Sequence, residues 1–209
     1  MDEDGNCRLV ECECMRVRRS MRMIEKSGLG NLLERYTLDD WKTPEKWQQE
    51  LKRAAQEYAE KPEGWFYIAG RPGTGKTHLC TAICSMLLRR GVEVRYLVWR
   101  DFSVKAKSIV TEAEEYERLL APYKRARVLY VDDLFKSGRG AKPTEGDINL
   151  AFELLNDRYN DERLATIISS EHTAETLLGI DEGLGSRVYE RTKGHYYDLA
   201  RRENWRLSH

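Results

Sequence analysis

Eight consecutive residues have the types and the spacing needed to hold a nucleoside triphosphate: Gly70-Arg71-Pro72-Gly73-Thr74-Gly75-Lys76-Thr77. They fit the phosphate-binding loop pattern, in which a Gly, four further residues and a second Gly precede Lys and then Ser or Thr. Glycines let consecutive backbone N–H groups converge on a phosphate, because no Cβ blocks the approach. Lys76 would then reach the β- and γ-phosphates, and the Thr77 hydroxyl would hold Mg²⁺.

The elements on either side of this loop have the order that the motif requires. Residues 65–69 are an apolar strand, and Leu79, Ile83 and Leu87 recur at helical spacing after the loop. The N-terminus of that helix would add partial positive charge beside the phosphates. A simple glycine turn needs neither Lys76 nor Thr77, so the pattern favours a nucleotide site.

A second group of chemically capable residues is the acidic pair Asp132-Asp133, which ends the apolar strand at residues 128–131. In P-loop ATPases the first carboxylate at such a strand end supports Mg²⁺, and a second one can act as general base on the attacking water. Two acids that merely end a strand are the alternative in isolation. Their place downstream of a P-loop favours the metal role for Asp132 and the catalytic role for Asp133.

Strands and helices alternate along the chain, which predicts an α/β fold with a parallel sheet covered on both faces. The predicted strands are residues 65–69, 92–99, 128–131, 165–170 and 195–199. Two helices have recognisable starts. One has Thr43 as N-cap followed by Pro44, and the other has Thr144-x-x-Asp147, which resembles a capping box.

The composition indicates a folded α/β domain with a small appendage. The chain has 209 residues, 41% of them hydrophobic and 33% charged, which is typical of globular proteins. Its 35 basic and 35 acidic residues cancel, so any affinity for nucleic acid must come from local patches. No apolar run approaches the roughly 20 residues of a membrane span, and the acidic start of the chain is unlike a secretory signal. We therefore expect a cytoplasmic protein with no membrane partner.

Residues 1–28 are the predicted basic N-terminal appendage. Five cations surround a short predicted helix at residues 15–26: Arg16, Arg18, Arg19, Arg22 and Lys26. They form either a solvated face or a docking surface for a partner protein or nucleic acid. Cys7, Cys12 and Cys14 offer three thiolates, whereas a closed structural zinc site needs four ligands. Reduced thiols are therefore favoured, and zinc is not expected at Cys12 and Cys14.

Four segments taken together resemble one known family: GRPGTGKT, VLYVDDLF, TIISSE and GLGSRVYER. As a set they are similar to the DnaC-type helicase loaders of the AAA+ superfamily, a group with DnaI and the IstB-like ATPases, and especially to phage and prophage forms. The resemblance implies a P-loop NTPase of the AAA+ type, a three-layer α/β/α sandwich around a central five-stranded parallel sheet. It makes residues 29–209 the ATPase domain, without the C-terminal helical lid of full AAA+ modules.

The resemblance also assigns roles to individual residues. Residues 70–77 become the Walker A loop, followed directly by His78, and together they would bind ATP with Mg²⁺. Asp132-Asp133 becomes the Walker B pair. The stretch Tyr36-Thr37 resembles the segment that closes over adenine.

Two further positions follow from the resemblance. The γ-phosphate sensor falls at Ser170-Glu171, where the usual Asn is replaced by Glu171. Because an ionised acid cannot donate a hydrogen bond, Ser170 is the better candidate for this role. Arg187 matches the arginine finger that is supplied to the ATP of a neighbouring subunit, and Arg191, one helical turn further on, is the fallback. The alternative for each is a surface arginine in a weak ion pair.

Two basic patches could bind single-stranded DNA. The first comprises Arg100, Lys105 and Lys107 in the helix after the second strand, and the second comprises Lys136, Arg139 and Lys142 in a glycine-rich loop. The resemblance favours the first patch. Our own hypothesis adds the second, because its glycines let the backbone approach phosphates. The replicative helicase would contact the basic N-terminal appendage.

The expected function is that of a helicase-loading ATPase from a phage or prophage replication module. ATP would drive self-association on single-stranded DNA, and slow hydrolysis would reset the assembly. One alternative is an IstB-like helper ATPase of transposition, which binds duplex DNA and a transposase. Another is a P-loop small-molecule kinase, against which stand the tandem acids Asp132-Asp133 and the lack of an arginine-rich lid.

Overall fold

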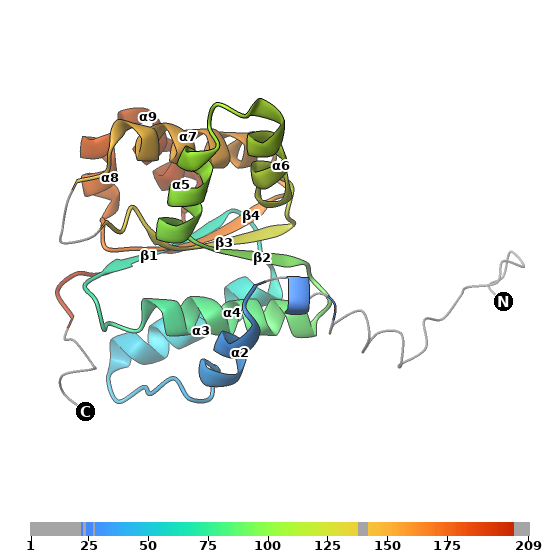
Figure 1. Ribbon diagram of the computed structural model, residues 1–209. Helices are drawn as coiled ribbons and strands as arrows, with labels where there is room; N and C mark the ends of the chain where they lie inside the picture. Colours follow the sequence, from blue (N-terminus) through green and yellow to red (C-terminus); the bar gives the residue numbers. More distant parts are fainter. Residues whose placement is uncertain (1–21, 23, 27, 138–141, 203–209) are drawn as a thin grey trace, which may run out of the picture.

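The computed structural model describes residues 22, 24–26, 28–137 and 142–202. Within them, five parallel strands form one sheet in the order β2-β3-β4-β1-β5. Their bounds are Trp65–Gly70 for β1, Val94–Val98 for β2, Val128–Leu134 for β3, Ala165–Ser170 for β4 and Tyr196–Leu199 for β5. The predicted α/β class with a central five-stranded parallel sheet is confirmed (Figure 1).

Helices cover both faces of this sheet (Figure 1). One face carries α2 (Gly30–Arg35), α3 (Lys46–Glu60) and α4 (Lys76–Arg89). The opposite face carries α5 (Trp99–Ser108), α6 (Ala113–Lys124), α7 (Glu145–Tyr159), α8 (Ala174–Ile180) and α9 (Glu182–Arg191). The layers are therefore the expected α/β/α sandwich. None of these described helices is long and apolar enough to cross a membrane.

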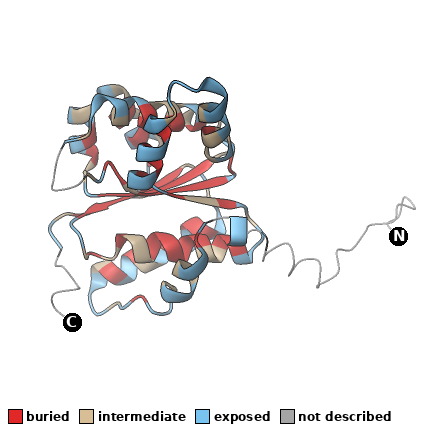
Figure 2. Cartoon of the chain, viewed as in Figure 1, coloured by how far each residue is buried: buried red, intermediate tan, exposed pale blue. Residues whose placement is uncertain are grey.

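The sheet is buried on both faces, which is why its strands are continuous apolar runs rather than alternating patterns. All six residues of β1 are buried. Because side chains alternate along a strand, Phe66 and Ile68 join the core beside α3 and α4, whereas Trp65 and Tyr67 join the core on the opposite face. Figure 2 shows buried residues along the strands and on the sheet-facing sides of the helices.

The C-terminal ends of neighbouring strands meet along one edge of the sheet. Ala69 near the end of β1 is paired with Ser170 at the end of β4, and Ser170 is also paired with Leu134 at the end of β3. Val98, which ends β2, is paired with Asp132. Ligands of open α/β sheets bind outside such strand ends, so this edge is where the candidate site is expected.

One predicted helix start is wrong and the other is confirmed. Helix α3 begins at Lys46 with Glu45 as its N-cap, not at Pro44 after Thr43. The reason lies in Gln48, whose side chain accepts the Glu45 N–H at 3.0 Å and so caps the chain at that residue. At α7 the predicted capping box is present: the Asp147 N–H donates to Thr144 Oγ1 at 3.3 Å, and the Thr144 N–H donates to Asp147 Oδ2 at 3.1 Å.

Other boundaries shift by one to three residues. Strand β3 continues through Asp132-Asp133 to Leu134 instead of ending before the acids, and β2 is shorter than the predicted strand at residues 92–99. In the appendage, Arg22 and residues 24–26 are helical, as predicted for residues 15–26. The rest of that prediction and the cysteines Cys7, Cys12 and Cys14 lie outside the described residues.

Candidate nucleotide-binding site

The phosphate-binding loop connects β1 to α4 and has the backbone that its glycines allow. Gly75 has a φ of 89° and is the N-cap of α4, which starts at Lys76. A Cβ on Gly75 would lie 2.4 Å from the Trp41 ring, so both the φ and the packing exclude a side chain there. The N–H groups of the first turn of α4 are consequently open to the space above the loop.

Lys76 lies inside this loop, where its side chain is buried. Its ammonium donates to the carbonyl oxygens of Gly70 at 2.8 Å and Arg71 at 3.1 Å. Burial lowers the pKa of Lys76, and the carboxylates of Asp133 and Glu171 act in the opposite direction. The loop thus holds a cation at its centre, with acids close enough to favour its charged form.

Asp132 is the most heavily hydrogen-bonded carboxylate of the site. It is 6% exposed, and four hydroxyl groups donate to it. Oδ1 accepts from Tyr130 at 2.7 Å, Ser169 at 2.5 Å and Thr77 at 3.2 Å, and Oδ2 accepts from Tyr96 at 3.1 Å. Burial raises the pKa of both tyrosines, so their hydroxyls stay protonated and remain donors. The four hydroxyl groups therefore fix the orientation of the Asp132 carboxylate.

The donor set fits a magnesium ion. The Thr77 hydroxyl lies 3.2 Å from Asp132 Oδ1, which brings together the two predicted ligands from α4 and β3. Mg²⁺ prefers oxygen ligands and is usually held by one or two protein groups together with substrate phosphates. Thr77 and Asp132 are therefore the residues that would hold the ion together with the phosphates of a bound nucleotide.

Asp133 projects from a strained end of β3. Its φ is 54° and that of Phe135 is 62°, a left-handed conformation that costs a non-glycine residue about 1–3 kcal/mol. The Asp133 N–H donates to Ser169 Oγ at 2.9 Å, which helps to hold this geometry. Asp133 lines the same pocket as Lys76 and Thr77, as its predicted role as general base requires.

The predicted sensor residues, Ser170 and Glu171, make contacts outside the pocket wall that Asp133 lines. Ser170 is buried, and its hydroxyl donates to Leu134 O at 2.8 Å and accepts the His172 N–H at 3.0 Å. Neither Ser170 nor Glu171 lines the pocket. Glu171 instead lies 3.3 Å from the ammonium of Lys136. The sensor role of Ser170 and Glu171 therefore stays a prediction.

The pocket above the loop has a volume of about 650 Å³, within the range of small-molecule sites. Tyr36 and His78 line it, with ring centroids 5.1 Å apart, and His78 Nε2 lies 2.7 Å from Thr37 O. The predicted adenine segment and His78 are thus in contact with each other beside the loop. Because a carbonyl oxygen can only accept, Nε2 of His78 is the donor in this contact.

Several residues that line the pocket were not predicted as site residues, among them Trp41, Trp47 and Arg202. Trp41 and Trp47 line the pocket from the connection before α3 and from its first turn, and the Arg202 guanidinium lies 5.0 Å from the centre of the Trp47 ring. The aromatic residues were visible in the sequence as a pair six positions apart. Only the fold shows that the segment after β5 brings Arg202 to the same place.

The two finger candidates lie away from the pocket of their own chain, which neither of them lines. Arg187 on α9 donates through Nε to Asn156 Oδ1 at 3.0 Å and through Nη1 to Gly183 O at 2.8 Å, with its guanidinium 4.8 Å from the Phe152 ring centre. Arg191 donates to Glu162 O at 3.5 Å. Either arginine could reach a nucleotide only from a second subunit.

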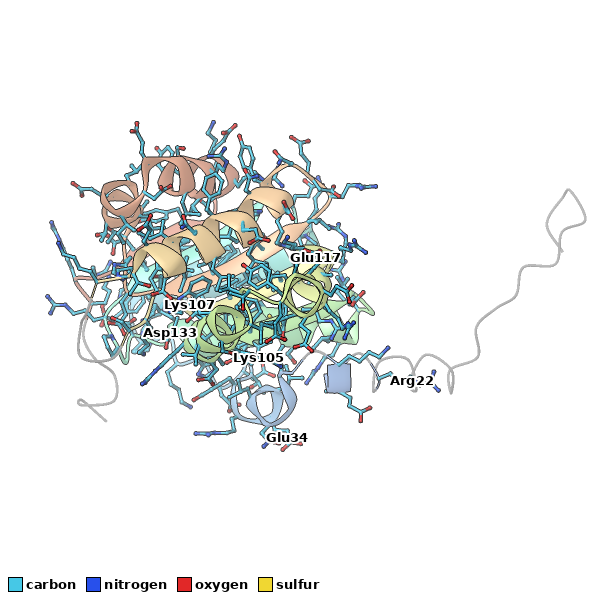
Figure 3. All side chains as sticks on the ribbon, turned by 45° about the horizontal axis from the view of Figure 1, so that its top comes forward. Arg22, Glu34, Lys105, Lys107, Glu117 and Asp133 are labelled. Atoms are coloured by element: carbon cyan, nitrogen blue, oxygen red, sulfur yellow. The ribbon has the colours of Figure 1, made fainter. Side chains whose placement is uncertain are left out.

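The predicted DNA-binding cations differ in their surroundings: some are paired with acidic side chains, and others are exposed at the surface. Lys105 and Lys107 project from α5 (Figure 3), but the Lys107 ammonium is 2.7 Å from Asp147 Oδ1 on α7. Arg100, Lys105 and Lys142 are exposed. Arg139 lies outside the described residues. Lys136 lines the nucleotide pocket and is paired with Asp133 at 2.7 Å.

A P-loop fused to a five-stranded α/β/α sandwich, with an acidic pair beside the loop, defines an ATP-binding protein of the AAA+ type. Residues 9–193 match the family of IstB-like ATP binding proteins. The chain belongs to that family.

Individual relatives agree with this assignment. XkdC of the phage-like element PBSX of Bacillus subtilis is 31% identical over 91% of this chain and 77% of its own length. YqaM of the same organism is 28% identical over 95% of this chain, which spans 66% of YqaM. The replicative helicase loader DnaC of Escherichia coli is 25% identical over 91% of this chain and 77% of its own length.

Solved structures share the fold. The DnaC helicase loader superposes with a TM-score of 0.67 at 19% identity, covering 82% of this chain and 99% of that one. The replication initiator DnaA bound to AMPPCP and single-stranded DNA gives 0.64 at 24% identity, covering 79% of this chain and 50% of that one. DnaI superposes with a TM-score of 0.61 at 21% identity, covering 83% of this chain and 91% of that one. The likeness establishes the AAA+ fold.

Proposed function

We propose that this chain is an ATPase that loads a replicative helicase onto single-stranded DNA within a phage or prophage replication module. The observation that carries the proposal is the contact between Thr77 and Asp132 at 3.2 Å, which joins the phosphate-binding loop to the acidic strand end. The similarity to helicase loaders and to a phage-like element protein supports the cellular setting.

Residues around the pocket would supply the chemical steps of ATP hydrolysis, and Arg187 of a neighbouring subunit would add to them. The triphosphate would lie along residues 70–77 with its terminal phosphate near Lys76, and the base would lie beside Tyr36, Trp41 and His78. Mg²⁺ at Thr77 and Asp132 would neutralise phosphate charge. Asp133 accepts a proton from water, whose oxygen attacks the γ-phosphorus while the bond to the β-phosphate oxygen breaks. The products are ADP and inorganic phosphate, with Asp133 returning its proton to solvent.

The energy of this cycle would be used for assembly. A ligand shifts a conformational equilibrium only through its different affinity for the two states, so ATP must bind the assembled form more tightly than the single chain. Exposed cations that could follow a DNA backbone lie on α5 and after β3, at Arg100, Lys105 and Lys142. Contacts of this kind recognise phosphates without reading sequence.

Self-association is also the route by which Arg187 would act. In a single chain its guanidinium is held by Asn156 and Gly183, so it would have to turn toward the nucleotide of a neighbour. We expect Arg187→Ala to lower ATP turnover by about 10³-fold or more, because the charge on the transferring phosphate is no longer neutralised. Turnover is measured as phosphate release in the assembled state.

A mixing experiment separates action across subunits from a structural role. Lys76→Met removes the loop cation but leaves Arg187 in place, so equal amounts of the Lys76→Met and Arg187→Ala chains should recover part of the activity that each lacks alone. Arg163→Ala, which changes an exposed arginine paired with Asp161, is the control for loss of charge. No recovery from two folded variants would exclude Arg187 as a finger.

The alternative is a helper ATPase of transposition that binds duplex DNA, since the matched family is the IstB-like one. The deciding experiment is co-purification with a replicative helicase, with and without ATP, together with binding to single-stranded and duplex DNA. A loader is expected to retain helicase in one nucleotide state and to prefer single strands. Removal of residues 1–27 should abolish helicase retention and leave ATP binding intact. Absence of a helicase complex in both states would refute the proposal.

A further inference from the structure

Three charged side chains form a bridge at the rim of the nucleotide pocket. The Lys136 ammonium lies 2.7 Å from Asp133 Oδ2 and 3.3 Å from Glu171 Oε1. One cation thus links the proposed general base, near the end of β3, to the residue that follows β4. The three side chains are 43%, 23% and 35% exposed for Lys136, Asp133 and Glu171, so water reaches all of them.

The bridge engages the carboxylate that ATP hydrolysis needs. The Lys136 ammonium donates to Asp133 Oδ2 at 2.7 Å, so it occupies a carboxylate oxygen that would otherwise be open to a water molecule in the pocket. As long as the Lys136 ammonium stays there, it therefore keeps this Asp133 oxygen from contacting water. A partly exposed ion pair is weak, so a stronger anion could displace it.

Lys136 is placed to meet such an anion. It lines the same pocket as Lys76 and Thr77, whereas Glu171 does not. The Ser170 hydroxyl, predicted to read the γ-phosphate, is occupied by Leu134 O and the His172 N–H. Of the described pocket-lining residues, Lys136 is the cation supplied from the β3 side, and its four-carbon stem allows the ammonium to move.

We propose that Lys136 is an exchangeable clamp, which bridges Asp133 and Glu171 in the empty site and transfers to the terminal phosphate of a bound nucleoside triphosphate. The transfer uncovers Asp133 Oδ2 for contact with a water molecule only when a γ-phosphate is present. ADP ends one phosphate earlier, so it would leave the bridge intact. This inference rests on the proposed ATPase function and adds a means of distinguishing ATP from ADP.

The test compares affinities for ATP and ADP in the full chain, measured by isothermal titration with Mg²⁺ present. Lys136→Met keeps most of the stem and removes the charge. ATP affinity is expected to fall about 10-fold, as for loss of one charge-assisted hydrogen bond, while ADP affinity changes less than about twofold. Lys136→Arg should restore the preference for ATP. Glu171→Gln removes one anchor of the bridge and should raise ATP affinity by about two- to fivefold.

The opposite signs at Lys136 and Glu171 distinguish a clamp from a merely structural ion pair, for which both changes would weaken the two nucleotides alike. Lys193→Met, at an exposed lysine outside the pocket, is the matched control. An unchanged ATP-to-ADP ratio in Lys136→Met would overturn the clamp. If Lys136→Met keeps the ATP-to-ADP affinity ratio of the unaltered chain but binds DNA more weakly, Lys136 belongs to the DNA interface. If the unaltered chain binds neither nucleotide, the proposed function fails instead.

Discussion

Replacing Asp133 with Asn should reduce ATP turnover by about 10²–10⁴-fold, the usual contribution of a general base, while ATP affinity should not fall, because Asn also removes one charged anchor of the Lys136 bridge. Asn keeps the shape of the side chain but cannot accept the proton of the attacking water. The backbone contact with Ser169 Oγ at 2.9 Å does not depend on the carboxylate, so the end of β3 should keep its geometry. Single-turnover phosphate release and equilibrium ATP binding measure the two quantities.

Asp132→Asn is the matched comparison, because it changes the neighbouring acid in the same way. That substitution removes the charge that four hydroxyl groups orient, so it should weaken Mg²⁺-dependent ATP binding as well as turnover. If Asp133→Asn instead retains the full rate, the general base is a different residue. If it loses ATP binding as severely as Asp132→Asn, the two acids do not have separate roles.

The largest effect on stability is expected at Arg158, a fully buried residue of α7. Its guanidinium donates to five acceptors: the carbonyl oxygens of Tyr123, Lys124, Ala126 and Ala165, and Oγ1 of Thr166. Burial lowers the pKa of Arg158 to about 9, so it remains charged at neutral pH. The residue ties α7 to the end of α6, to the connection that follows it and to the start of β4.

Arg158→Met would leave several of these buried acceptors without a donor, each costing about 1–3 kcal/mol. We expect a loss of about 3–5 kcal/mol in the free energy of unfolding, which corresponds to a decrease in Tm of roughly 6–20 °C for a domain of this size. Thermal unfolding followed by circular dichroism checks this.

Arg163→Met is the control for Arg158→Met, since Arg163 is 86% exposed and paired with Asp161. An exposed pair contributes about 0–1 kcal/mol, so this variant should unfold close to the unaltered chain. Equal Tm values for the two variants would mean that water or relaxation satisfies the acceptors around Arg158.

The sequence was sufficient to predict the features that depend on local patterns. The P-loop is contiguous, and the parallel alternation of strands and helices places Asp132 at the same sheet edge, so the contact with Thr77 could be expected. The capping box at Thr144 and Asp147 is also local. The start of α3 was missed because Thr43-Pro44 and Glu45 with Gln48 both carry N-terminal signals, and a sequence does not rank them.

Features that depend on register and on distant segments could not be predicted. Ser169 and Ser170 are adjacent, and their side chains point to opposite faces of β4: Ser169 donates to Asp132 and Ser170 to Leu134 O. Which of the two serines faces Asp132 depends on how β4 is paired with β3. That pairing shifts register between Val131 and Leu134, and no sequence pattern marks the shift. The glycines that follow Lys136 indicated a DNA-binding loop. Its pairing with Glu171 joins residues near the ends of two different strands, so that contact could not be predicted from the sequence.

The tryptophans that line the pocket should report nucleotide binding through their fluorescence. Trp41 meets His78 edge-on with ring centres 5.4 Å apart, and the Arg202 guanidinium lies 5.0 Å from the centre of the Trp47 ring. Because both indoles line the pocket, their emission should change when a nucleotide binds there. Trp65 and Trp99 are buried in the core on the far side of the sheet, where their emission should stay constant. The protein therefore carries built-in fluorophores whose signal can follow nucleotide exchange in real time without a label.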